Sequence, residues 1–291
     1  SLVGSEMCIR DRCRIVLSDQ QKALADDERG IERKKGVRIH MNREFLYELL
    51  ETASVSGFEE EIQRKVIKYA RGFADEVYTD EIADVVSIVN PDAEIKVMLS
   101  AHMDEIGLMV SHITEKGMLH VSKAGGIYPG TYLGQKVRIM HEGNVVYGAV
   151  RNHGSLNKKE LEITDIIIDI GAVSREDAMA HVACGDPVSF DTDYRELLND
   201  RLCARGLDDR LGGYIILEAA KKAKERGCTC GIYATTTVGE ELTKHGAAWC
   251  ASRITPTLAI VLDVTYTSDY EGTRAIENGE ILLGGGPVFL H

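Results

Sequence analysis

The sequence predicts an α/β domain that is interrupted by a small β-barrel domain. Helix-like and strand-like segments alternate from Met41 and resume at Leu207, whereas residues 113–199 contain short strands, tight turns and few helices. In addition, the strand-like segments of the α/β part end on acidic residues or histidine. We therefore assign residues 41–112 and 200–291 to one discontinuous domain and residues 113–199 to an insert.

The elements of the first part follow in order from Met41. Two helices are predicted over NREFLYELLETAS and SGFEEEIQRKVIKYARGF, with Ser56 as a candidate N-cap of the second. Their apolar residues recur at helical spacing on one face: Phe45, Leu46, Leu49 and Leu50, then Ile62, Val66 and Tyr69. Two short strands in EVYTDEIADVVSIVN and a buried strand in EIKVMLSAH complete this part.

The insert and the return to the α/β part have their own patterns. KVRIMHEGNVVYGAV predicts a hairpin that turns at Glu142, Gly143 and Asn144, LEITDIIIDIG is a second β-rich segment, and only SREDAMAHV is helical there. A helix is then predicted over RLGGYIILEAAKKAKERG, followed by strands in GIYATTT and TLAIVLD. Because the last segment is apolar almost throughout, we expect it to be buried on both faces.

Residues 1–40 do not fit this architecture. The segment LVGSEMCIRDR, residues 2–12, resembles a translated adapter of the kind used in transposon-based sequencing libraries. Residues 13–40 lack a sustained helix or strand period, and their charge-rich run DDERGIERKK is typical of disorder. We therefore expect translation to start at Met41, with a genuine polar extension as the alternative; N-terminal sequencing of the natural protein tests this.

The composition limits the classes of partner. The 291 residues are 44% hydrophobic and 27% charged, which is ordinary for a globular protein. The net charge of -12 argues against nucleic acid or an anionic membrane surface as a partner. No apolar segment reaches the ~20 residues of a membrane span. Cys228 and Cys230 are too close for zinc-knuckle spacing, so we expect buried free thiols and a cytoplasmic location.

Side chains that can bind metal follow the predicted strands or begin a predicted helix. Six residues share this placement: His102, Asp104, Asp208, Glu240, Glu241 and Asp263. Ligands gather at the carboxyl ends of strands in open α/β sheets, and oxygen donors with one imidazole are typical of two-metal hydrolases. Residues two apart on a strand point the same way, so Asp104 can accept from the ring nitrogen of His102 that does not bind metal.

Each of these residues also has a purely structural interpretation. His102 alone fits a hydrogen-bonded histidine at a strand end, and Asp208 fits an N-cap. Glu240 and Glu241 fit exposed acids in the first turn of a helix. Asp263 is the hardest to explain in this way, because an ionised carboxylate beside a buried strand is unfavourable unless it is paired or metal-bound.

Four motifs in this order resemble the signatures of the glutamyl aminopeptidase/cellulase-M family, which includes the tetrahedral aminopeptidases. They are AHMDEIGLMV, GLDDRLGGY, VGEELTKHGA and LDV. The similarity runs from Met41 through the insert, for example in GGIYPGTYLGQKV and GDPVSF. It implies a zinc-exopeptidase-like domain with a mixed sheet and a β-barrel insert. The insert lies between Asp104 and Asp208, which favours the aminopeptidase arrangement over the carboxypeptidase-like one.

The resemblance also implies a role for each candidate residue. His102, Asp208 and Asp263 would bind one divalent ion, Asp208 and Glu241 a second, Glu240 would be the general base and Asp104 would orient His102. The two ions, Zn²⁺ or Co²⁺, would polarise the scissile carbonyl and lower the pKa of a shared water molecule. The implied activity is removal of N-terminal residues from short peptides.

One departure from the family pattern bears on activity. In the family, a histidine well downstream of the GGGPV-type segment completes the second metal site. His291 follows Pro287 too closely to match, so we do not assign it as a ligand. We expect the sequence to lack this ligand and the last strands of the catalytic domain, and therefore to be inactive as it stands.

The resemblance further implies self-assembly, up to a twelve-subunit shell that admits only short peptides. Three alternatives remain open: a deacylase or carboxypeptidase of the same superfamily, an endoglucanase, and a non-catalytic assembly protein. An endoglucanase needs two carboxyls across a sugar cleft and has no need of the histidine. The preferred N-terminal residue of the substrate is not predictable from this sequence.

Overall fold

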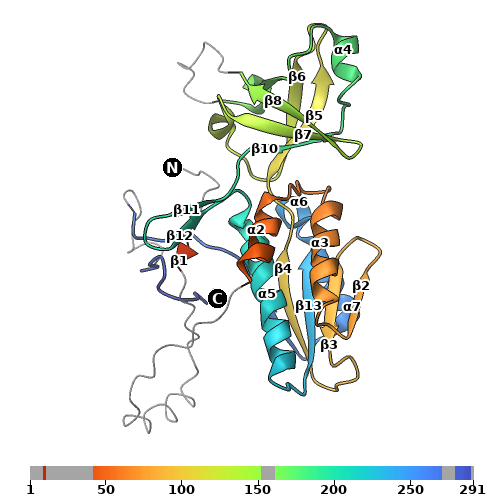
Figure 1. Cartoon of the computed structure of the whole chain (residues 1–291), viewed down its shortest axis with the longest axis vertical. Coiled ribbons are helices and arrows are strands. Elements are labelled where there is room, and N and C mark those ends of the chain that lie inside the picture. Colours follow the sequence, from red (N-terminus) through yellow and green to blue (C-terminus); the bar gives the residue numbers. More distant parts are fainter. Residues whose placement is uncertain (1–8, 11–41, 152–160, 271–278, 290–291) are drawn as a thin grey trace.

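The computed structural model of the chain describes residues 9–10, 42–151, 161–270 and 279–289 (Figure 1). It contains a five-stranded mixed sheet with helices on both faces and, separately, a closed six-stranded barrel. The predicted α/β class with an inserted barrel is therefore confirmed. The domain boundaries stay a prediction, and the first strand of the barrel begins before residue 113. Apart from Ile9–Arg10, the leader lies outside the described residues.

The sheet has the strand order β14-β4-β13-β3-β2. Its strands are β2 (Glu76–Thr79), β3 (Val85–Val89), β4 (Lys96–His102), β13 (Gly231–Thr237) and β14 (Leu258–Val261). Strands β4, β13 and β14 are parallel, and β3 and β2 continue the sheet in antiparallel pairing. The carboxyl ends of the three parallel strands therefore meet at one edge of the sheet.

In the described residues, this domain has five helices: α2 (Arg43–Glu51), α3 (Glu60–Ala70), α5 (Leu207–Glu225), α6 (Glu240–Thr243) and α7 (His245–Ile254). The predicted apolar face of α2 is buried, and its N-cap Asn42 accepts a hydrogen bond from the amide of Phe45 at 3.3 Å. The Ser56 prediction is wrong, because Glu59 occupies the N-cap position of α3. Ser56 lies one turn too early to cap a helix that begins at Glu60.

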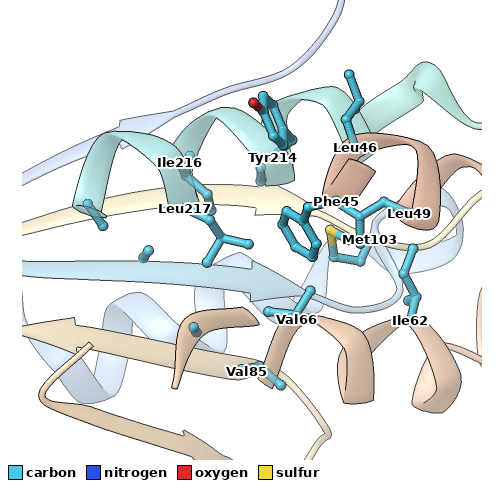
Figure 2. Packing of buried hydrophobic residues seen from close by; sticks show 14 of the residues in the cluster. Phe45, Leu46, Leu49, Ile62, Val66, Val85, Met103, Tyr214, Ile216 and Leu217 are labelled. Atoms are coloured by element: carbon cyan, nitrogen blue, oxygen red, sulfur yellow. The ribbon is translucent and has the colours of Figure 1, made fainter. Parts of the chain in front are cut away.

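Alternate residues of the strands pack against helices on opposite faces of the sheet. Ile232 and Ala234 of β13 join the core formed with α2, α3 and α5, whereas Tyr233 joins a smaller cluster with Cys250 and Ile254 of α7. Figure 2 shows the larger core, in which residues of α2, α3 and α5 converge on the sheet. Burying each such side chain stabilises the fold by about 1.5–3 kcal/mol, so this face holds the helices in place.

The barrel has the strand order β10-β5-β6-β9-β8-β7 and lies beyond the end of the sheet where β4 leads into β5 (Figure 1). Its elements are β5 (Gly107–Ile113), β6 (Leu119–Ala124), β7 (Lys136–His141), β8 (Asn144–Val150), β9 (Ile167–Asp169), α4 (Arg175–Met179) and β10 (Pro187–Phe190). The predicted hairpin and the predicted helix are confirmed as β7–β8 and α4. A further small antiparallel sheet, drawn next to α2 in Figure 1, consists of β1 (Ile9–Arg10), β12 (Arg201–Cys203) and β11 (Arg195–Leu197).

The expectation that the segment TLAIVLD is buried on both faces is wrong. All four residues of β14 are exposed, with 65% of Val261 accessible. The reason is position in the sheet, since β14 is an edge strand whose described pairing is with β4 alone. Strand composition predicted burial, whereas burial of both faces also requires elements packed above and below the strand, and no residue of β14 belongs to a described core cluster.

Two further expectations concern the state of the cysteines and helices that could span a membrane. The cysteines of the described segments, Cys184, Cys203, Cys228, Cys230 and Cys250, are free thiols. Only the last is fully buried and the first is exposed, so the prediction of buried thiols is wrong for Cys184. In the part of the chain that the structure describes, no helix has the length and hydropathy needed to cross a membrane.

Candidate active site

The structure brings the six candidate residues together at the carboxyl edge of the sheet. Strands β4 and β13 are parallel neighbours, and their register places His102 opposite Thr237. The residues that follow the two strands therefore leave the sheet at the same edge. The potential ligand atoms of His102, Asp208 and Asp263 all lie within 4.8 Å of one another. The same holds for His102 with Glu240 and Glu241. Two sets of potential metal ligands, both of which include His102, therefore lie next to each other.

His102 is held between two carboxylates. Its ring is 4% exposed, with Nδ1 3.2 Å from Asp104 Oδ1 and 3.1 Å from the Asp104 carbonyl oxygen. Because both of these atoms accept, Nδ1 carries a proton, and Nε2 faces away from Asp104. Nε2 lies 3.0 Å from Asp208 Oδ1. Ligand atoms at about 2.0–2.2 Å from one zinc ion are separated by about this distance.

Asp104 connects the histidine to the glutamate pair. It is fully buried, and its two carboxylate oxygens accept from the amides of Glu240 and Glu241, each at 3.0 Å. Burial raises the pKa of Asp104, but hydrogen bonding to His102 outweighs burial and the net shift is downward. For His102, burial lowers the pKa, and the bonds to Asp104 and Asp208 outweigh it and raise the pKa to about 11.

Asp208 and Asp209 interrupt the first turn of α5. Both have non-helical backbone angles near the start of α5, and the capping contact, to the amide three residues further on, is made by Asp209 rather than by Asp208. The structural interpretation of Asp208 as an N-cap is therefore wrong. The Asp208 side chain is 56% exposed, whereas Asp209 is buried and accepts from the Gly212 amide at 3.0 Å. Only Asp208 is directed toward the ligand group with His102.

Negative charge is crowded at this edge. Burial raises the pKa of Glu241 to about 7 and also raises the pKa of Asp263, and the charge of Asp208 adds to both shifts. Burial and the charge of Asp263 raise the pKa of Asp209 to about 8. Cations relieve such repulsion, and carboxylate oxygens with one imidazole nitrogen are donors that divalent ions accept. The residues present therefore fit divalent metal ions.

Sequence reasoning missed a buried ion cluster centred on Glu105, the residue that follows Asp104. Glu105 accepts from the Ser54 amide at 3.0 Å and from the Ser189 hydroxyl at 3.3 Å, and it pairs with both Arg205 and Arg210. Burial alone would raise the pKa of Glu105, but the two arginines outweigh it and hold it at about 2. The charged residue types are visible in the sequence, but their pairing across a hundred residues is not.

Residues 85–290 match the profile of a family described as M42 glutamyl aminopeptidase. The chain belongs to this family. A lysyl aminopeptidase of Pyrococcus furiosus is 34% identical over 256 residues, which cover 84% of this chain and 72% of the relative. The M42 assignment makes the chain a peptidase of the aminopeptidase type, as the sequence predicts.

Solved structures agree with the M42 assignment. A TET aminopeptidase from the marine sediment archaeon Thaumarchaeota archaeon SCGC AB-539-E09 superposes with a TM-score of 0.74 at 31% identity, covering 80% of this chain and 68% of that one. Pyrococcus horikoshii TET1 peptidase, which can assemble into a tetrahedron or a large octahedral shell, gives a TM-score of 0.71 at 30% identity. That comparison covers 79% of this chain and 72% of TET1. The chain thus spans about two thirds to three quarters of the length of these relatives.

Proposed function

We propose that the protein is a metal-dependent aminopeptidase whose site consists of the six residues at the carboxyl edge of the sheet. The observation that carries the proposal is the position of Asp104, whose carboxylate contacts the ring of His102 and the amides of both Glu240 and Glu241. A hydrogen-bonded histidine at a strand end would not need this arrangement. It is what an orienting carboxylate between two sets of metal ligands requires.

The chain would hold two ions through shared ligands. His102, Asp208 and Asp263 form one ligand set, and Asp208 with Glu241 contributes to the second. Bound Zn²⁺ or Co²⁺ would polarise the scissile carbonyl and lower the pKa of the attacking water. The donor set does not choose between these metals, because nitrogen and oxygen sites accept several divalent ions.

Proton transfer would be the task of Glu240. This carboxylate would accept the proton of the attacking water and pass it to the leaving amine. In the structure it pairs with Lys244 at 3.0 Å, a contact with an exposed side chain that is free to give way to substrate. Its amide is fixed by Asp104, so the base would be held at a defined distance from the ligand atoms of His102.

The biological setting is proposed from the relatives. We infer short peptides as substrates, a cytoplasmic location and self-assembly into a homo-oligomer of up to twelve subunits. The assembly of the Pyrococcus horikoshii TET1 peptidase supports the last of these. The barrel, which projects from the catalytic sheet, would supply contacts between subunits (Figure 1).

A substrate panel tests the proposed function. Because we expect the sequence to be inactive as it stands, the natural protein is purified for this test and the later ones. It is assayed on amino-acyl p-nitroanilides, N-acyl amino acids and a β-glucan, before and after removal of metal by a chelator. We expect hydrolysis of the anilides alone, loss of that hydrolysis with chelator and its return with Co²⁺ or Zn²⁺. Hydrolysis of N-acyl amino acids would instead indicate a deacylase or carboxypeptidase, and chelator-insensitive cleavage of the glucan would indicate an endoglucanase.

A further inference from the structure

The turn that carries Glu240 and Glu241 is held by hydrogen bonds from its backbone amides. Four consecutive amides each donate to the side chain of a buried acid: Val238 to Asp84 Oδ1 at 2.9 Å, Gly239 to Glu59 Oε1 at 3.1 Å, and Glu240 and Glu241 to Asp104 at 3.0 Å. The M42 signatures and the roles considered above account only for Asp104. The first two contacts have no function assigned to them.

Glu59 joins the turn to the segment between α2 and α3. Its side chain is 6% exposed, and the oxygen that accepts from Gly239 also accepts from the amide of Gly57 at 2.9 Å. Glu59 is the N-cap residue of α3, whose buried face packs against the core of the sheet. One oxygen of a residue on a fixed helix therefore sets the position of Gly239.

Asp84 joins the same turn to the sheet and to α7. It is fully buried immediately before β3, and its own amide donates to Asp80 at 2.9 Å. While Oδ1 accepts from Val238, Oδ2 accepts from the Cys250 thiol at 3.2 Å. Each carboxylate oxygen thus has its own partner, and the turn is tied to two packed elements.

Other backbone hydrogen bonds of the turn are local, such as those from the amides of Thr243 and Lys244 to the Gly239 carbonyl, each at 3.0 Å. Helix α6 has only four residues, too few to be stable by its own hydrogen bonds. Gly239 has a φ of +68°, and a Cβ there would lie 2.4 Å from the His245 ring, so no side chain can anchor this position. A buried amide left without an acceptor costs about 1–3 kcal/mol. The turn would therefore rearrange if these acceptors were removed.

We propose that Glu59 and Asp84 are positioning residues, which fix the Val238–Gly239 backbone and thereby aim the Glu240 base and the Glu241 ligand. This inference rests on the proposed function. It requires only an acceptor oxygen at each position, not a negative charge. Replacement by the isosteric amide should therefore preserve the function, whereas replacement by alanine should not.

The test compares E59A, E59Q, D84A and D84N with the unsubstituted protein. The control is E218A, which removes another buried acid, bonded to Tyr69 and 8% exposed, from a part of α5 outside the site. Three quantities are measured: Co²⁺ affinity from its visible absorption, amide hydrogen exchange of residues 238–241, and kcat with KM. Thermal melting identifies variants that are folded at the assay temperature.

We expect the alanine variants to bind Co²⁺ about 10–100-fold more weakly, the range found when groups supporting metal ligands are removed. Exchange should quicken at Val238 in D84A and at Gly239 in E59A, and kcat should fall more than KM changes. E59Q, D84N and E218A should remain within a few-fold of the unsubstituted protein. Should the alanine variants unfold, the inference is judged on the amide variants, and a tenfold loss of affinity in folded E59Q and D84N would overturn it.

Two other outcomes separate this inference from the proposed function. If the unsubstituted protein binds Co²⁺ and the folded alanine variants bind it equally well, the positioning role is overturned and the proposed function stands. If the unsubstituted protein neither binds Co²⁺ nor hydrolyses any anilide, the proposed function fails and the positioning role fails with it.

Discussion

At the scale of single residues, the site depends on which atoms of each side chain already make hydrogen bonds and which remain available. Asp104 accepts a hydrogen bond from Nδ1 of His102, and the other ring nitrogen, Nε2, is directed toward Asp208. Glu240 and Glu241 are adjacent in sequence, but their amides bond to different oxygens of Asp104, and Glu240 also pairs with Lys244 at 3.0 Å. This is the local basis for giving one the role of base and the other the role of ligand.

The Glu240→Gln variant tests that division of roles. Glutamine keeps the shape of the side chain and the amide bond to Asp104 but cannot accept a proton, so we expect unchanged Co²⁺ affinity and a kcat lower by about 10²–10⁴-fold. Co²⁺ absorption and steady-state hydrolysis of an amino-acyl anilide measure the two quantities. Activity equal to that of the unsubstituted protein would end the assignment of Glu240 as the base.

At the scale of elements, the barrel reaches the site through the loop that follows β6. Gly125 has a φ of +89°, and a Cβ there would lie 2.7 Å from Ile106 Cγ2 and 3.3 Å from Glu241 Cβ. The two domains therefore meet at the glutamate pair.

Gly125→Ala should displace Glu241 or the loop. We expect kcat/KM to fall about tenfold or more, because small misplacements of reacting groups are costly in rate. Gly143→Ala is the matched control: its φ is +80° and a Cβ there would meet no atom within 4 Å, so it carries the backbone strain without the contact. The idea fails if folded Gly125→Ala has the kcat/KM of the unsubstituted protein.

Most elements could be predicted because their signals are local. The apolar face of α2 and the β7–β8 turn follow from periodicity and turn residues within a few positions. The exposure of β14 could not be predicted in this way, because it depends on its edge position and on which elements pack over it. The same limit applies to the site, since Glu59 meets Gly239 across 180 residues and Asp84 meets Val238 across 154.

At the scale of the whole molecule, the Glu105 cluster fastens the two domains. Glu105 lies between β4 and the first barrel strand, Ser189 is on the last barrel strand, and Arg205 and Arg210 flank the start of α5. All three charged groups are buried. Breaking such a cluster on one side leaves uncompensated buried charge, which typically costs about 3–5 kcal/mol.

The sign of the pH dependence follows from the pKa of Glu105. The folded state holds it at about 2, below its ordinary value of 4.5, so its contribution is full above pH 4.5 and is lost as the pH falls through 2. The difference corresponds to about 3 kcal/mol. We expect Glu105→Gln to be less stable at pH 7 and the gap to narrow between pH 4.5 and 2, as measured by urea unfolding.

The control for this prediction is Glu115→Gln. Glu115 is an exposed acid, with 79% of its side chain accessible, that pairs with Arg175 at 3.0 Å. Such a surface pair contributes about 0–1 kcal/mol, so this variant should change stability little at any pH. A gap between Glu105→Gln and the unsubstituted protein that stays constant from pH 7 to pH 2 would contradict the account of the cluster.

The central claim is that the residues at the carboxyl edge of the sheet form one metal-dependent peptidase site. Titration of the metal-free protein and of its Asp208→Ala variant with Co²⁺, with anilide hydrolysis followed in the same samples, tests it most directly. We expect the unsubstituted protein to bind Co²⁺ and its rate of hydrolysis to rise as the metal binds. Because Asp208 would be shared by both ions, we expect the variant to lose at least a hundredfold in Co²⁺ affinity and in the rate of hydrolysis. Equal Co²⁺ binding by the two proteins, or hydrolysis that is independent of the metal, would contradict the claim.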